Sequence, residues 1–219
     1  MTILEAIDQR HSVRSFKDTP IDVQTRAQMD EFVAECNSKS GLGIFIVYDD
    51  PAGFDSAMAH YGKFHGCSNY IVLAGTRSGD FEYLCGYYGE QIVLRAQQLG
   101  LNTCWTAMTF NKKQVKKLIP QGQSLCMVIA LGYGKDQGVP RKSKTPADVI
   151  LGAVPLWFDN GIEAALKAPT AMNQQKFAFY EKDGDPYIKV KGLSMYTMVD
   201  LGIAAYHFEA ATGRKVNRE

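Results

Sequence analysis

The chain has 219 residues, of which 46% are hydrophobic and 21% are charged. This length suits one large globular domain or two small packed ones, and the composition excludes intrinsic disorder. Its 24 lysines and arginines against 23 aspartates and glutamates leave a formal net charge of +1. Because so small a charge gives no overall field, we expect no nucleic-acid partner and no membrane, and any bound anion must be met by a local cluster.

Cysteine usage and the N-terminal sequence predict the compartment. The five cysteines are scattered, odd in number and never spaced C-x-x-C, which argues against a disulfide framework or a zinc site. The first ten residues, MTILEAIDQR, carry acidic residues where a secretory signal needs a basic and then an apolar run. We therefore expect a cytoplasmic protein that binds no metal.

In chain order, the expected elements begin with a short helix. Ile3, Leu4 and Ile7 recur at helical spacing, and the pattern stops near Arg10. The next 125 residues alternate between helical and strand patterns, which predicts an α/β or α+β layer fold. The expected elements are a helix around residues 29–36, strands at 44–50 and 69–75, a helix at 80–100, a strand at 102–105, a helix at 112–119 and a strand at 125–134.

A basic, proline-flanked segment at residues 139–146 is the candidate internal junction. Beyond it, Thr145, Pro146 and Asp148 predict a helix N-terminus with an N-cap, a proline at N1 and an acidic first turn. A helix at 158–168, a hairpin at 176–190 with Asp183 and Gly184 in its turn, and a last helix at 196–212 are expected to follow.

This second series of elements resembles a repeat of the first. Phe45 falls on Phe177 at an offset of 132 residues, whereas the long helices ending at Gly100 and Gly213 differ by 113. The difference between the offsets indicates 19 extra residues in the first copy. Chance is the alternative explanation, since any two helix–strand–helix units align loosely on hydrophobicity. The hypothesis is a duplication into residues 1–150 and 151–219, which together form one intertwined domain.

Two polar clusters carry the candidate chemistry. Arg10, Ser12 and Arg14 alternate in a stretch expected to be extended, which places two guanidinium groups and a hydroxyl on one side, as a phosphate monoester requires. The alternative is a solvated basic strip. In the second cluster, at residues 168–175, Asn173 and Gln175 carry donors and acceptors that suit the edge of a heterocycle. A plain loop after a helix is the alternative there.

Taken together, R-x-S-x-R at 10–14, A-P-T-A-M-N-Q-Q at 168–175 and L-G-L-N-T-C-W at 99–105 resemble the FMN-dependent nitroreductase family. The similarity extends to residues 130–134 and the basic run 141–144, and so covers most of the chain. Within the family, the chain resembles the subgroup built as a single-chain pseudo-dimer. The resemblance implies an α+β nitroreductase-like fold that is internally duplicated.

The resemblance also implies how FMN is bound. In the family, the basic motif holds the phosphate and ribityl chain, and the proline-containing loop packs against the isoalloxazine ring. That loop normally follows the basic motif closely, but here residues 36–41 are degenerate and the good copy comes after residue 165. This order implies one complete FMN site per chain and a monomer. The residues assigned to FMN are Arg10, His11, Ser12, Arg14, Thr103, Trp105, Arg141, Lys142, Lys144, Pro169, Thr170, Ala171, Asn173 and Gln175.

The implied activity is ping-pong hydride transfer from NADH or NADPH to a small aromatic nitro, quinone or related acceptor. No catalytic side chain is assigned, because the flavin carries the reaction and Arg14 is expected to tune the ring. Residues 50–68 are expected to shape the acceptor pocket. The alternative function is a flavin-binding or ligand-binding protein of the same fold without turnover, and a third is an interaction module without flavin.

Overall fold

The computed structural model describes residues 1–192 and 195–219. Its contacts divide the chain into two compact units. The central unit comprises Arg10–Phe81 and Ile92–Pro140, and the C-terminal unit comprises Met1–Gln9, Glu82–Gln91 and Arg141–Glu219. The division between Pro140 and Arg141 falls inside the basic segment 139–146. Helix α4 (Phe81–Gln98) contributes residues to both units.

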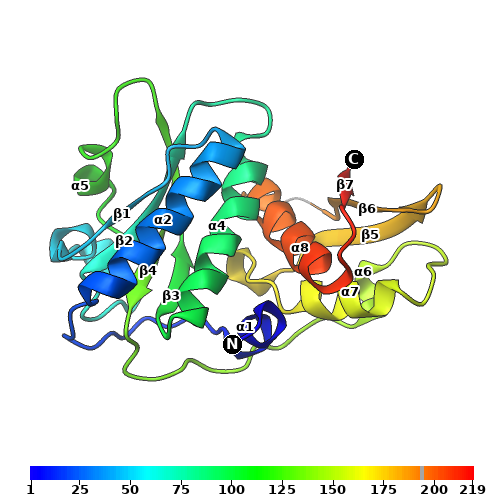
Figure 1. Ribbon diagram of the computed structural model, residues 1–219, viewed down its shortest axis with the longest axis horizontal. Helices are drawn as coiled ribbons and strands as arrows, with labels where there is room; N and C mark the ends of the chain where they lie inside the picture. The colour runs from blue at the N-terminus through cyan, green and yellow to red at the C-terminus, as the bar shows by residue number, and fades with distance from the viewer. Residues whose placement is uncertain (193–194) are drawn as a thin grey trace. The chain divides into compact units, whose positions relative to one another are not determined.

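A four-stranded antiparallel sheet organises the central unit (Figure 1). Its spatial order is β1-β2-β4-β3. The strands are β1 (Phe45–Val47), β2 (Asn69–Gly75), β3 (Asn102–Thr106) and β4 (Ser124–Gly132). All seven residues of β2 are buried, so this strand is covered on both faces. The predicted strands are therefore present, with ends within a few residues of the expected ones.

Helix α2 (Val23–Ser40) packs on this sheet through Met29, Val33 and Cys36. It begins where the Asp22 carboxylate accepts a hydrogen bond from Thr25 N at 2.9 Å. It ends at Gly41, whose φ of +70° is the left-handed conformation that glycine adopts without strain. The other short helices of this unit are η1 (Pro51–Gly53), α3 (Ala57–Tyr61) and α5 (Lys112–Lys116). Helix α5 is shorter than the predicted helix at 112–119.

The C-terminal unit combines helices with a three-stranded sheet of order β5-β6-β7. Strands β5 (Phe177–Lys182) and β6 (Asp185–Val190) form the expected hairpin. Its turn residues Asp183 and Gly184 have φ of +55° and +89°, as a tight two-residue turn requires. The remaining elements are α1 (Ile3–Gln9), α6 (Pro146–Val149), α7 (Phe158–Leu166), η2 (Ala171–Asn173), α8 (Thr197–Thr212) and β7 (Asn217–Arg218).

Helix α8 is the buried axis of the C-terminal unit. It packs against α7, β5, β6 and α1, and most of its residues from Val199 to Phe208 are buried. A Cβ on Gly86 of α4 would clash with the carbonyl group of Val199, so the backbones of α4 and α8 approach closely at this point. Two buried residues of α8 are polar, Asp200 and His207. A helix that is apolar on nearly all sides places these two groups away from water.

The combination of helices with one antiparallel sheet and one mixed sheet, in which β7 pairs in parallel with β6, confirms the α+β class. No helix of the two described stretches is long and apolar enough to cross a membrane. Within the same residues, no cluster of three or more histidine, cysteine, aspartate or glutamate side chains could hold a metal ion.

Candidate functional site

Backbone pairing holds the basic motif extended along the edge of the central sheet. Val13 N donates to Thr103 O of β3 at 3.0 Å, and Ser12 pairs with Thr103 in parallel. On its other side, His65 N donates to Arg14 O at 2.9 Å. Val13 and Phe16 point into the core, whereas Ser12 and Arg14 are exposed. The predicted alternation is therefore present at residues 12–14, whereas Arg10, which was expected on the same side as Ser12 and Arg14, is buried.

The buried thiol of Cys104 shows that the three polar groups of the motif gather. Burial raises the pKa of Cys104. The charge of Arg14, a hydrogen bond with Ser12 and the charge of Arg10 act in the opposite direction, each lowering the same pKa. The hydrogen bond places the Ser12 hydroxyl in contact with the thiol, and the two charges place both guanidinium groups in its neighbourhood. Two guanidinium groups and one hydroxyl are thus brought to the same place beside β3.

Of the two guanidinium groups in this cluster, only that of Arg14 faces solvent. Arg10 is only 1% exposed, whereas Arg14 is exposed and forms no ion pair within the described parts of the chain. Two guanidinium forks with a hydroxyl between them match the geometry and charge of a phosphate monoester. The donor set therefore fits the phosphate end of FMN.

The other predicted residues of the central unit lie beside the motif. Thr103 is buried and supplies the carbonyl that accepts from Val13, and Trp105, further along β3, is half-buried. Gly138 lies against His11, because a Cβ there would be 2.6 Å from the Cβ of His11. The segment after β4 therefore packs against the basic motif.

The second cluster, residues 169–175, is a strained loop in the C-terminal unit. Met172, Asn173 and Gln175 have φ of +51°, +53° and +47°, the left-handed conformation that side chains other than glycine rarely adopt. Met172 is 89% exposed and Asn173 is also exposed. Such strain costs of order 1–3 kcal/mol per residue and persists only where the surrounding structure enforces it.

Gln175 helps to hold the 169–175 loop in its strained backbone conformation. Its side chain is buried, and its amide nitrogen donates to Leu166 O at 2.7 Å and to Ser143 Oγ at 3.0 Å. Its amide oxygen accepts from Lys144 N at 2.8 Å. The amide that the sequence suggested for a heterocycle edge is therefore engaged by the protein itself, and it fastens the loop to α7 and to residues 143–144.

Further hydrogen bonds join the 169–175 loop to the basic run. Asn173 Nδ2 donates to Lys142 O at 2.6 Å, and Lys144 Nζ donates to Gln175 O at 2.9 Å. Thr170 Oγ1 accepts from Gln175 N at 3.0 Å. Ala171 begins η2 next to it, Pro169 precedes it, and Arg141 is half-buried. The structure thus brings residues 141–144 and 169–175 together in one unit, and residues 10–14 and 103–105 together in the other.

Asp200 is a residue of this region that the sequence analysis missed. Both of its carboxylate oxygens accept from Ala171 N, at 2.9 and 3.2 Å. The side chain is 4% exposed, and burial raises the pKa of Asp200 to about 7, although the hydrogen bond from Ala171 lowers it. A lone acid in the apolar run TMVDLGIAAY was the available signal.

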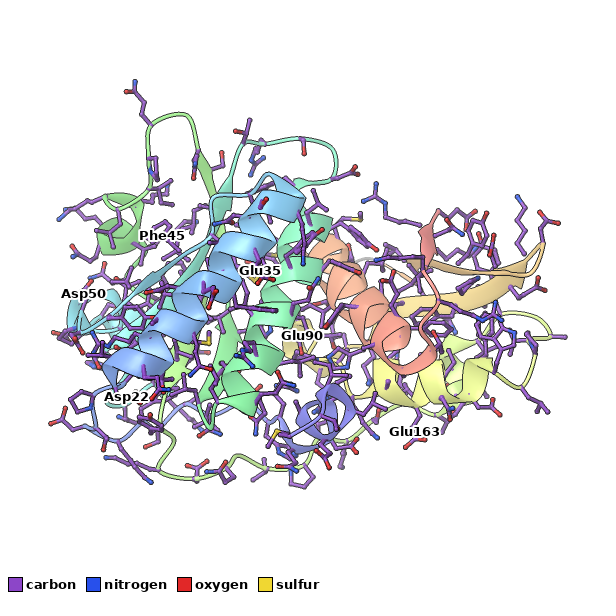
Figure 2. All side chains as sticks on the ribbon, in the orientation of Figure 1. Asp22, Glu35, Phe45, Asp50, Glu90 and Glu163 are labelled. Atoms are coloured by element: carbon purple, nitrogen blue, oxygen red, sulfur yellow. The ribbon has the colours of Figure 1, made fainter. Side chains whose placement is uncertain are left out.

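A second buried polar group joins three helices of the C-terminal unit. His207 Nδ1 lies 2.9 Å from Ala164 O, and its Nε2 lies 2.8 Å from Glu90 Oε1. Glu90, on helix α4, is labelled in Figure 2. Because a carbonyl only accepts, Nδ1 carries a proton, and a further proton lies between Nε2 and the carboxyl group. Both side chains are fully buried. This pair stabilises the packing of α4, α7 and α8.

A hollow of about 500 Å³ opens in the central unit. It is formed largely by residues within 50–68, the segment expected to shape an acceptor pocket, together with Asp18 and Asp49. Asp55 and His60 provide polar walls, whereas Phe54 and Phe64 are buried in the core beneath the hollow. His65 also lines the hollow, and its backbone N–H is bonded to Arg14 O. The hollow therefore adjoins the basic motif.

Comparisons with known proteins agree with these observations. The family described as "putative TM nitroreductase" matches residues 2–212. A "putative nitroreductase" of Thermotoga maritima is similar in structure, with a TM-score of 0.69 and 23% identity over 96% of this chain and 83% of that one. A comparison with curated proteins gave no match.

Two further solved structures share the fold. A "putative nitroreductase in complex with FMN" from Desulfovibrio desulfuricans has a TM-score of 0.54 and 16% identity, covering 70% of this chain and 98% of that one. A Bacteroides thetaiotaomicron protein described as a "putative NADH dehydrogenase/NAD(P)H nitroreductase" has a TM-score of 0.53 and 20% identity, covering 67% and 95%. The fold of the chain is thus nitroreductase-like.

Proposed function

Since this chain belongs to the "putative TM nitroreductase" family, we propose that it is an FMN-dependent oxidoreductase that takes a hydride from NADH or NADPH. The observation that carries the proposal is the cluster of Arg10, Ser12 and Arg14 beside Cys104. The FMN complex of the Desulfovibrio relative and the NAD(P)H in the description of the Bacteroides relative support it.

In this proposal the basic motif binds the phosphate. The buried Arg10 and the Ser12 hydroxyl donate hydrogen bonds, and Lys142, Lys144 and Arg141 add positive charge. Arg14 is exposed and unpaired in the described chain, so its charge is available to the flavin ring. A cation beside the ring favours the reduced, more negative form. The residues beside the basic motif, which are His11, Thr103 and Trp105, would complete the FMN site in this proposal.

The 169–175 loop would meet the ring of the same FMN, an assignment that rests on the family resemblance. Asn173 is exposed and can present its amide oxygen, while Pro169, Thr170 and Ala171 supply the backbone surface. Gln175 acts by positioning, because its amide already fastens the loop. FMN held there would supply the hydride chemistry between a nicotinamide and the acceptor, with solvent as the source of the protons, and the chain's own residues would bind and orient the two.

The hollow beside Arg14 is the proposed acceptor site. The segment that forms most of it is the one expected to shape an acceptor pocket, and Phe54 and Phe64 lie in the core beneath it. The substrate class proposed, which rests on the family resemblance, is a small planar acceptor such as a nitroaromatic or a quinone.

A gene duplication would explain how a single chain forms a complete FMN site. Gly86 meets Val199, and these residues are separated by the 113 positions that relate the two long helices. When two equivalent helices pack about a twofold axis, a residue on the axis contacts the equivalent residue of the other helix. The contact between Gly86 and Val199 would be of this kind. The 48–68 segment lies between β1 and β2, whereas only two residues join β5 and β6. This difference accounts for the 19 extra residues, and the proposal expects one FMN per chain and a monomer.

The test is flavin binding followed by turnover. The purified protein, reconstituted with FMN and desalted, should retain about one flavin per chain and show the absorption of bound flavin. Addition of NADH or NADPH should bleach that absorption, and a nitroaromatic or a quinone should restore it. A protein that takes up no FMN contradicts the proposal, and flavin binding without bleaching leaves a flavin-binding protein.

Arg14→Ala gives the residue-level test, with Arg77→Ala as its control. Both changes remove one exposed arginine from the central unit. Losing a charge-assisted hydrogen bond worth about 1.5–3 kcal/mol should weaken FMN binding by roughly ten- to hundredfold in Arg14→Ala, with no change in Arg77→Ala. Equal affinities of the two variants for FMN would show that Arg14 does not bind FMN.

A further inference from the structure

We infer that Asp200 is the positioning residue that holds the 169–175 loop in its flavin-binding conformation, and that its ionised carboxylate is the holding form. The inference rests on the proposed function, because it concerns the loop assigned to the flavin ring. Asp200 belongs to α8 and is neither a member of the sequence motif nor placed against the flavin.

The geometry singles out Asp200. Its two oxygens share the Ala171 amide at 2.9 and 3.2 Å, and Ala171 is the residue that begins η2. The left-handed residues Met172 and Asn173 follow directly. The far end of the loop is fastened by Gln175. The strained residues are therefore held between two buried anchors, and Asp200 is the charged one.

The charge is what makes this anchor unusual. The hydrogen bond from Ala171 needs only an acceptor oxygen, which an asparagine would also supply. A buried carboxylate without a cationic partner costs stability when it is ionised, and no lysine, arginine or histidine pairs with Asp200 in the chain as described. Ionising the buried Asp200 lowers the stability of the fold, and its hydrogen bond goes to a strained, exposed loop. It follows that the charge is kept for the conformation of the loop and not for the stability of the core.

The surroundings leave burial and the Ala171 amide as the two influences on the pKa of Asp200. The acidic, basic and histidine side chains of α1, residues 82–91, α7, residues 167–176, β5, β6 and α8 are Glu5, Asp8, Glu82, Glu90, Asp159, Glu163, Lys167, Lys176, Glu181, Lys182, Asp185, Lys189, His207 and Glu209. The tyrosines and the cysteine of these elements and of the α8 N-cap are Tyr83, Cys85, Tyr87, Tyr88, Tyr180, Tyr187, Tyr196 and Tyr206, and Lys142 and Lys144 bond to the loop. None of these contributes to the shift.

The direction of the effect follows from hydrogen-bond strength. An ionised acceptor binds an amide more strongly than a neutral one does. As the pH rises and Asp200 loses its proton, the Ala171 bond tightens and the loop is held more firmly. Flavin binding should therefore strengthen with pH in the wild type beyond any change that comes from the flavin phosphate itself.

Asp200→Asn tests this, with Asp159→Asn as a matched control. The control removes one exposed carboxylate from the same unit. At pH 8.5 we expect Asp200→Asn to bind FMN about fivefold more weakly than the wild type while unfolding at a higher urea concentration. At pH 5.5 the two affinities should converge, and comparison at each pH cancels the titration of the flavin phosphate. A variant that loses both stability and affinity at pH 8.5, or that binds as the wild type does at every pH, overturns the inference.

A measurement without flavin separates this inference from the proposed function. In the flavin-free protein, the Ala171 amide proton resonance should shift with pH in the wild type and in Asp159→Asn, following the titration of Asp200, but should stay constant in Asp200→Asn. If the wild type binds no FMN, the proposed function fails, whereas a resonance that does not titrate in the wild type shows that Asp200 does not hold the loop through its charge.

Discussion

Two sites of this protein, Arg14 in the central unit and the buried acids and histidine of the C-terminal unit, hold charge in opposite ways. The central unit places Arg14 on an exposed strip whose backbone is already paired with β3 and with His65, so its charge costs little. The C-terminal unit buries Asp200, Glu90 and His207. In the first case a ligand can use the charge without any change in the fold. In the second case charge and packing are coupled, so a change in one alters the other.

The largest effect on the free energy of unfolding is expected for His207→Ala. The change leaves the Glu90 carboxyl and the Ala164 carbonyl buried without the imidazole they share. Breaking a buried pair of this kind costs about 3–5 kcal/mol, which denaturant unfolding would measure.

The control is His60→Ala, which removes an imidazole whose side chain is 63% exposed in the central unit. Its free energy of unfolding should stay within about 0.5 kcal/mol of the wild type. If His207→Ala lost less than about 1 kcal/mol, the buried pair would not couple charge to packing in the C-terminal unit.

A smaller effect is expected from the titration of Asp200 itself. The folded pKa of about 7 lies above the reference value of 3.8, so the native state holds the proton more tightly. This contribution is fully present below about pH 4 and is lost as the pH rises through 7. Three pKa units correspond to about 4 kcal/mol.

The measurement is the free energy of unfolding of the wild type and of Asp200→Asn between pH 4 and 8.5. The difference between the two proteins should move by up to about 4 kcal/mol toward the variant as the pH rises. A difference that is independent of pH would show that Asp200 does not titrate in this range.

The same contrast explains what the sequence could predict. Local patterns predicted the strands at 69–75 and 102–105 and the hairpin turn at Asp183 and Gly184, because each depends on neighbouring residues alone. The alternation at residues 12–14 of the basic motif is local in the same sense.

The remainder depends on contacts distant in sequence. Gln175 bonds to residues 143 and 144, and Asp200 bonds to residue 171, so neither role can be read from neighbouring residues. The division of the chain was also beyond local patterns, because the C-terminal unit includes Met1–Gln9 and Glu82–Gln91. Asp200 and His207, seven residues apart in the apolar part of helix α8, were the signal available in the sequence.

The smallest expected effect is on the stability of Arg14→Ala. Val13 and Phe16 hold the strip to the core, and the Arg14 carbonyl, which the substitution keeps, accepts the bond from His65. The free energies of unfolding of Arg14→Ala and Arg77→Ala should therefore agree within about 0.5 kcal/mol in the absence of FMN. Saturating FMN should stabilise Arg77→Ala more than Arg14→Ala, since a ligand stabilises the native state in proportion to the logarithm of its concentration over Kd. A clear loss of stability in flavin-free Arg14→Ala would show that this unit, too, couples its charge to its packing.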